Sequence, residues 1–140
     1  MTQRLLVDTW FWLALKDRSD QDHALAMLTN EELVHRKITY VTTNFILAET
    51  YTLLRRRVRP QVAITFGQEI QKAIDLTVIE LVHILPEMER EAWALFERYD
   101  DIVDLSYTDC TTFAAMRSMG LSEVLTNDQH FAMMGLILRP

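Results

Sequence analysis

Short apolar or β-branched runs alternate with longer stretches of helical apolar spacing along this 140-residue sequence. The runs are typical of buried strands, and apolar residues spaced three and four apart are typical of amphipathic helices. Glycine and proline occur only three times each, so we expect few long loops. The alternation predicts an α/β fold, a three-layer sandwich with helices on both faces of a mostly parallel central sheet. The expected strands are 5–7, 38–42, 77–82, 123–126 and 136–138, and the expected helices are 10–15, 19–36, 44–57, 60–74, 86–99, 106–120 and a short one from 128.

The composition indicates a single globular domain covering residues 1–140. Hydrophobic residues make up 49% and charged residues 24%, a balance that excludes a disordered chain. Cys110 is the single cysteine, so no intrachain disulfide can form and we expect a reducing, cytoplasmic setting. The N-terminal apolar patch is broken by Asp8, unlike a signal peptide. No run approaches the roughly 18 apolar residues of a membrane span, so we expect no membrane contact.

Four acidic residues occupy positions where this fold places ligand sites, beyond the carboxyl ends of parallel strands. Asp8 directly follows the first strand, and Asp128 follows the strand that ends at 126. Asp109 lies in the first turn of the helix before that strand, and Glu49 in the second turn of the helix after the second strand. Each also has a simpler explanation. Asp8 and Asp128 can cap helices, Asp109 can complete a capping box, and Glu49 can be a solvated helix residue.

Carboxylates that share one cleft repel each other, so they take up protons or bind a cation. Their hard oxygen atoms suit Mg²⁺ or Mn²⁺, and Mg²⁺ commonly takes its remaining ligands from water and from substrate phosphate. Such an ion generates a hydroxide nucleophile and neutralises the leaving oxygen. The pattern therefore indicates metal-assisted hydrolysis of a phosphodiester.

Four segments, in this order and spacing, resemble the acidic motifs of PIN-domain ribonucleases. They are 5–9 (LLVDT), 42–50 (TTNFILAET), 105–110 (LSYTDC) and 125–131 (LTNDQHF). The likeness extends over nearly the whole chain, and the compact length is similar to that of the VapC-type toxins of toxin–antitoxin pairs. The resemblance implies a parallel-sheet sandwich, homodimers, divalent-metal-dependent cleavage of RNA, and a small antitoxin protein as a partner.

Carried over to this chain, the resemblance implies that the four acidic residues are both catalytic and metal-binding. Asp8 and Asp109 are the expected direct ligands. Glu49 would bind metal or orient the attacking water, and Asp128 would act through a water molecule. The neighbouring polar residues expected to hold these carboxylates and waters are Thr9, Asn44, Ser106, Thr126 and Asn127. Asp101 and Asp104 can assist, although a solvated loop explains them better.

The formal net charge of −6 argues against a nucleic-acid partner at first sight, but the charge is unevenly spread. Residues 49–79 hold five basic and three acidic residues, whereas residues 80–109 hold two basic and nine acidic ones. The densest basic run is Arg55, Arg56, Arg57 and Arg59, a candidate for holding RNA phosphates. Cations that favour the end of a helix dipole explain this run equally well.

Other chemistries fit less well. The histidines show no zinc-binding spacing, and His130 is expected to be structural. Cys110 is expected to be an inert, partly buried thiol. The aromatic run 10–12 is either core or a partner surface. An aspartyl-phosphate phosphatase would need an acidic residue at position 10, which is Trp10. A housekeeping RNA-processing nuclease and a non-catalytic PIN-like module that binds RNA or protein stay open as alternatives.

Overall fold

The computed structural model describes residues 3–133 and 137–138. A parallel sheet in the strand order β3-β2-β1-β4-β5 forms its centre, which confirms the predicted α/β architecture. Arg4 of β1 aligns with Thr39 of β2, and Val7 aligns with Leu125 of β4. Residue 136 of the last expected strand lies outside the described residues. The strands are β1 (Arg4–Val7), β2 (Thr39–Thr43), β3 (Ile79–Val82), β4 (Glu123–Leu125) and β5 (Ile137–Leu138).

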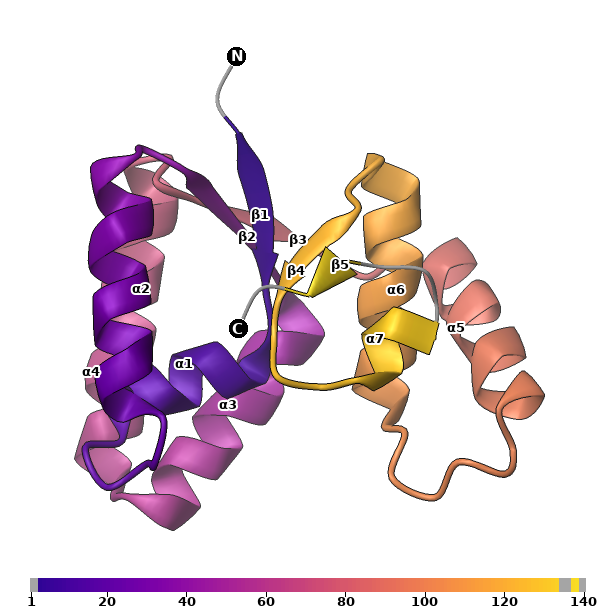
Figure 1. Cartoon of the computed structure of the whole chain (residues 1–140), viewed down its shortest axis with the longest axis horizontal. Helices are drawn as coiled ribbons and strands as arrows, with labels where there is room; N and C mark the ends of the chain where they lie inside the picture. Colours follow the sequence, from indigo (N-terminus) through magenta and orange to yellow (C-terminus); the bar gives the residue numbers. More distant parts are fainter. Residues whose placement is uncertain (1–2, 134–136, 139–140) are drawn as a thin grey trace.

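Helices cover both faces of this sheet (Figure 1). The chain moves outward from β1 through β2 to β3, then returns across β1 to β4. Right-handed crossovers therefore place α1 to α4 on one face and α5 to α7 on the other. None of the helices among the described residues is both long and apolar enough to cross a membrane. The helices are α1 (Thr9–Lys16), α2 (His23–His35), α3 (Asn44–Arg57), α4 (Pro60–Asp75), α5 (Pro86–Arg98), α6 (Tyr107–Met119) and α7 (His130–Met133).

Local sequence sets most of the helix ends. Thr43 Oγ1 accepts a hydrogen bond from the backbone N–H of Ile46 and so caps α3. Pro60 and Pro86 stand in the first turns of α4 and α5, where a missing N–H costs nothing. Gly120 ends α6 with a φ of 69°, a left-handed conformation that glycine adopts without strain.

One helix begins later than the sequence indicated. The expected helix over 19–36 starts only at His23. The preceding loop is held by its own side chains instead. Asp17 Oδ1 accepts from both the N–H and the hydroxyl of Ser19, and Asp20 Oδ1 accepts from the N–H of Asp22. Such side-chain bonds to nearby backbone compete with the first helical turn.

The main core lies between the sheet and helices α1 to α4. Residues 5–7 of β1 are at most 1% exposed, and Phe11 and Phe66 are equally buried. Trp12 packs edge-on against Tyr40, with ring centroids 5.9 Å apart. The aromatic run 10–12 is thus largely core, although Trp10 is half-buried and donates its Nε1–H to Asp22.

Helices α5 and α6 have smaller clusters of their own. One contains Ala92, Leu95, Leu105 and Phe113 around Cys110. Cys110 is fully buried, and this burial, reinforced by the negative charge of Asp109, raises its pKa to about 11. A protonated thiol without access to solvent is a poor nucleophile. The structure therefore agrees with an inert role for Cys110.

Candidate active site

The four acidic residues singled out from the sequence line one cavity of about 360 Å³ at the carboxyl edge of the sheet. Asp8 enters it from the end of β1 and Asp128 from the loop after β4. Asp109 comes from the first turn of α6 and Glu49 from the second turn of α3. The topology explains the convergence, because β1 and β4 are neighbours whose carboxyl ends meet at one edge.

Asp8 is only 6% exposed. Its carboxylate does not cap α1, although it stands at the cap position. Instead, the hydroxyl of Thr126 donates a 2.7 Å hydrogen bond to Oδ2. Burial raises the pKa of Asp8 to about 6, and the negative charges of Asp128 and Glu49 add to the rise. A positive charge beside Asp8 would stabilise its ionised form in this position.

Asp109 is 7% exposed, and the capping box expected from the sequence is present. Its backbone N–H donates to Ser106 Oγ over 3.0 Å, and its Oδ2 accepts from the backbone N–H of Ser106 over 3.2 Å. These bonds do not remove it from the cavity, which both residues line. Burial, followed by the charges of Asp8 and Asp128, raises the pKa of Asp109 well above its ordinary value. The box thus orients a carboxylate that still faces the other acids.

Asp128 is held from several sides. Its N–H donates to Thr126 Oγ1 over 3.0 Å, so one hydroxyl connects Asp128 to Asp8. Its Oδ1 accepts from the backbone N–H of His130 over 2.9 Å and lies 2.9 Å from His130 Nδ1. The other ring nitrogen of His130, Nε2, lies 3.1 Å from Oδ1 of Asp104.

His130, which the sequence predicted to be structural, lies between Asp128 and Asp104 beside this site. Asp109, Asp128 and His130 each offer a ligand atom, and these atoms lie within 4.8 Å of one another. The sequence signal was its place two residues after Asp128. The contact with Asp104 joins the start of α7 to the loop before α6, two segments far apart in the chain, which no local pattern shows.

The five neighbouring polar residues fall into three groups. Thr126 and Ser106 hold carboxylates as described. Thr9 and Asn127 line the cavity, and the buried Oγ1 of Thr9 has no protein partner among the described residues. The structure does not bring Asn44 to this cavity. Its Oδ1 accepts from the backbone N–H of Ile84 over 2.8 Å and so connects α3 to the chain after β3.

The basic run divides among different surfaces. Arg57 lines the acidic cavity and a larger neighbouring cavity, and Arg59 lines the larger one only. Arg55 faces a separate hollow beside Tyr51, and Arg56 is exposed and borders none of these cavities. Asp20, which the sequence did not single out, also lines the acidic cavity.

The donor set fits a hard divalent cation. Five carboxylates, those of the four predicted acids and Asp20, line one cavity, and Arg57 is the single basic residue on its wall among the described residues. Burial, the main cause of the raised pKa values of Asp8 and Asp109, outweighs the hydrogen bonds that favour their ionised forms. Oxygen ligands favour Mg²⁺ or Mn²⁺ over softer metals.

A parallel α/β fold with acidic residues clustered at the carboxyl ends of its strands can be compared with known families. The model of the PIN domain family matches residues 5–135. The chain therefore belongs to the PIN-domain family.

Individual relatives refine this assignment. The chain is 33% identical over 138 residues to the 23S rRNA-specific endonuclease VapC20 of Mycobacterium tuberculosis, an alignment covering 97% of this chain and 98% of the relative. The crystal structure of that species' VapC20, described as a sarcin–ricin loop cleaving toxin, superposes with a TM-score of 0.79 at 32% identity, over 95% of this chain and 96% of that one. VapBC2 from Rickettsia felis, bound to a promoter DNA fragment, is 14% identical with a TM-score of 0.67 over 98% of both chains, which shows a shared fold.

Proposed function

We propose that this protein is a divalent-metal-dependent endoribonuclease that hydrolyses RNA phosphodiester bonds. The observation that carries the proposal is the cavity into which Asp8, Glu49, Asp109 and Asp128 converge at the carboxyl edge of the sheet. The relative with 33% identity, named as an rRNA endonuclease, supports RNA as the substrate.

Asp8 and Asp109 would hold the metal, Mg²⁺ or Mn²⁺, because they are the most buried of the four acids. When bound, such an ion supplies Lewis acidity and lowers the pKa of a coordinated water molecule. Thr126 and Ser106 keep the two carboxylates oriented through their hydrogen bonds.

The remaining residues of the cavity have separate tasks in this proposal. Glu49, half-buried on α3, takes the proton of the attacking water or helps to bind the metal. Asp128 completes the acidic set, and Asn127 and Thr9 offer hydrogen bonds to water. Arg57 offers its guanidinium to the phosphate.

The biological role that we favour is that of a toxin restrained by a small antitoxin protein in the cytoplasm. The names of the relatives support it, because they include a VapC20 toxin and VapBC complexes. A homodimer is the expected assembly. A housekeeping RNA-processing role would not predict growth arrest that an antitoxin relieves. Induced expression should arrest growth only for the active protein, and coexpression of the antitoxin should relieve the arrest if the toxin role is correct.

The direct test is cleavage of RNA by the purified protein. We expect cutting with Mg²⁺ or Mn²⁺, loss of cutting in EDTA, and recovery when the ion is restored. Asp8→Asn and Asp109→Asn should each lower the rate by about 1000-fold or more, equivalent to roughly 4 kcal/mol of transition-state stabilisation. Circular dichroism should show that both variants keep the fold.

Asp100→Asn is the matched control, because it removes the same charge from an exposed position outside the cavity. It should cut at the normal rate. Metal-independent cutting, or normal cutting by Asp8→Asn, would contradict the proposal. Absence of both cutting and metal binding would favour the non-catalytic binding module.

A further inference from the structure

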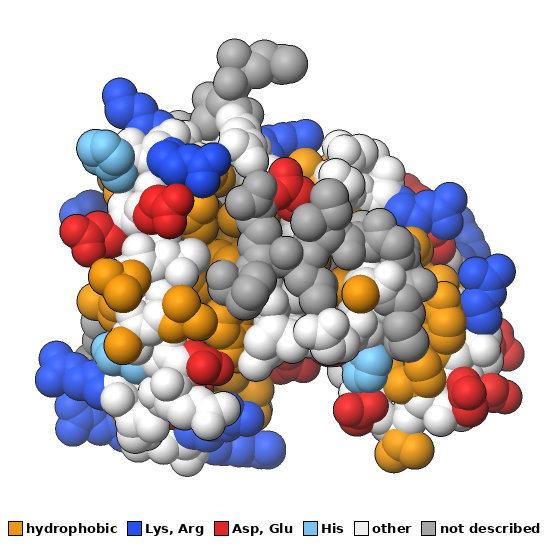
Figure 2. Space-filling model, in the orientation of Figure 1, with side chains coloured by type: hydrophobic (Ala, Val, Ile, Leu, Met, Phe, Trp, Pro, Cys, Tyr) orange, Lys and Arg blue, Asp and Glu red, His pale blue; other side chains and the backbone are white. Residues whose placement is uncertain are grey.

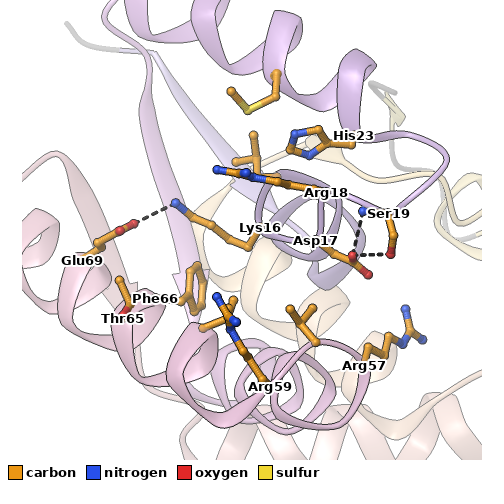
Figure 3. A pocket seen from close by; sticks show the side chains of 14 residues that line it. Lys16, Asp17, Arg18, Ser19, His23, Arg57, Arg59, Thr65, Phe66 and Glu69 are labelled. Atoms are coloured by element: carbon orange, nitrogen blue, oxygen red, sulfur yellow. Dashed lines mark hydrogen bonds and ion pairs between the residues drawn. The ribbon is translucent and has the colours of Figure 1, made fainter.

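A second cavity, of about 770 Å³, adjoins the acidic one, and Arg57 lines both. Its walls come from the end of α1, the loop before α2, and the corner between α3 and α4 (Figure 3). Its position beside the proposed cleavage site makes it a candidate for holding a part of the substrate that is not itself cut.

The charge of this second cavity is positive. Its wall contains four cationic side chains, Lys16, Arg18, Arg57 and Arg59, and two acidic ones. Both acids have partners within the wall. Glu69 forms a 2.8 Å ion pair with Lys16, and Asp17 accepts two hydrogen bonds from Ser19.

The three arginines make no ion pair within the part of the chain that the structure describes. Arg18 and Arg59 reach into the cavity from opposite walls in Figure 3, and Arg57 lies at its edge with its guanidinium directed away from Arg59. Unpaired guanidinium groups on facing walls fit an anion between them, because each presents several donors in a fixed plane.

Backbone structure fixes where these arginines stand. The N–H groups of Val58 and Arg59 both donate to the carbonyl of Leu54 at the end of α3, over 3.0 and 3.2 Å. Pro60 then begins α4 directly. The dipole of α3 explains a cation at Arg57. It explains neither Arg59, which stands beyond the end of α3, nor Arg18 on the opposite wall.

Resting on the proposed ribonuclease function, we propose that this cavity is a binding site for the RNA backbone that flanks the bond to be cut. Arg57 leads the strand out of the acidic cavity, and Arg18 and Arg59 hold a neighbouring phosphate between them. An RNA strand fits better than an isolated anion, because its phosphates repeat and can occupy both cavities at once. The protein thereby holds RNA from one side of its metal site despite a net charge of −6.

The test measures binding of a fluorescein-labelled single-stranded RNA to protein carrying Asp8→Asn, which binds without cutting. On that background, Arg18→Ala with Arg59→Ala should raise Kd by about 10-fold or more at low salt. It should also reduce the slope of log K against log salt by about 0.7, because one phosphate contact to a single strand is lost. The matched control is Arg90→Ala with Arg98→Ala, two exposed arginines of α5 that line neither cavity. It should change Kd by less than about 2-fold.

Two results would overturn the inference. One is an equal rise in the Kd for RNA in the Arg18/Arg59 double variant and in the Arg90/Arg98 control. The other is no RNA binding by the Asp8→Asn protein at all. If the Arg18/Arg59 double variant kept its affinity for RNA but no longer bound the antitoxin, the inference would also be overturned. The cavity would then be a binding site for the antitoxin. Since the measurement needs no cleavage, it is separate from the proposed activity. In the cutting assay with otherwise native protein, the Arg18 and Arg59 changes should raise KM and leave kcat nearly unchanged.

Discussion

The two parts of the chain that meet at the acidic cavity differ in charge and in packing. Residues 1–79 contain ten basic and nine acidic residues, whereas residues 80–140 contain four and eleven. In the view of Figure 2, Lys and Arg side chains cluster at the lower left, and Asp and Glu side chains cluster at the lower right, below further Lys and Arg side chains at the right edge. The first part holds nearly all of the main core, and α5 and α6 pack in small clusters.

The cavity takes two acids from each part: Asp8 and Glu49 from the first, Asp109 and Asp128 from the second. Neither part alone can form the site. The comparison suggests a division of labour, in which the first part provides the rigid frame and the basic surface for RNA. The second part would complete the proposed metal site, and the charge of its acidic face would repel nucleic acid.

The largest expected difference concerns stability. Leu54 of α3 is fully buried in the main core, and Leu95 of α5 is 7% exposed in a small cluster. We expect Leu54→Ala to lower the free energy of unfolding by about 4 kcal/mol and Leu95→Ala by about 2 kcal/mol. The densely packed side chains around Leu54 can shift less to fill the cavity that the substitution leaves. Urea unfolding of the two variants measures this. An equal or larger loss at Leu95 would show that the α5 clusters are as tightly packed as the main core.

The second expected effect concerns pH. The pKa of Asp8 is 3.8 in an unfolded chain and about 6 in the folded protein. The protonated form therefore favours folding. That stability is fully present below pH 3.8 and is lost as the pH rises through about 6. Asp8→Asn removes the titration and still offers an acceptor to Thr126. In metal-free protein, the stability of the variant relative to the native chain should rise by about 2 kcal/mol between pH 4 and pH 7.

Urea unfolding in EDTA at several pH values checks this difference, and Asp100→Asn serves as the control. Added Mg²⁺ should stabilise the native protein at pH 7 but not the variant, because the ion binds only the folded site. A difference that does not change with pH would mean that Asp8 ionises as easily in the folded as in the unfolded chain.

How much of this could be foreseen depends on whether a feature is local. The strands and the acids that follow them were predictable, because a polar residue directly after a buried strand must lie at the edge of the sheet. Asp8 and the capping box of Asp109 are examples. The contact between His130 and Asp104 was not predictable, because it joins the start of α7 to the loop before α6, whose approach depends on how α6 and β4 pack.

The sequence also could not show which arginine of the basic run faces the acidic cavity. Neighbouring residues on a helix point about 100° apart, so Arg55, Arg56 and Arg57 cannot share one surface. Which of them faces the site depends on the rotation of α3 against α1 and α4. Asn44 shows the same limit: its motif position was recognisable, but its side chain binds the N–H of Ile84 instead of entering the cavity.

A smaller effect is expected at His130, which connects the start of α7 to Asp104 in the loop before α6. His130→Asn should weaken metal binding by about 10-fold, because it removes the imidazole that lies 2.9 Å from Asp128 and 3.1 Å from Asp104. The exposed Asp104 contacts His130 and lies further from the other acids, so Asp104→Asn should weaken metal binding by about 2-fold. Isothermal titration with Mn²⁺ at pH 7 measures both. The opposite ranking would identify Asp104 as the closer partner of the metal.

The smallest expected effects separate arginines that are adjacent in sequence. Arg57 borders the acidic cavity, whereas Arg56 borders none of the cavities described. Both are exposed, both lie in the last turn of α3, and both lose the same charge when replaced. Arg57→Ala should raise KM for RNA by about 5-fold and Arg56→Ala by less than about 2-fold. Equal effects would mean that the basic surface acts only through its total charge. A difference would show that RNA follows the path between the two cavities, because only position distinguishes the two residues.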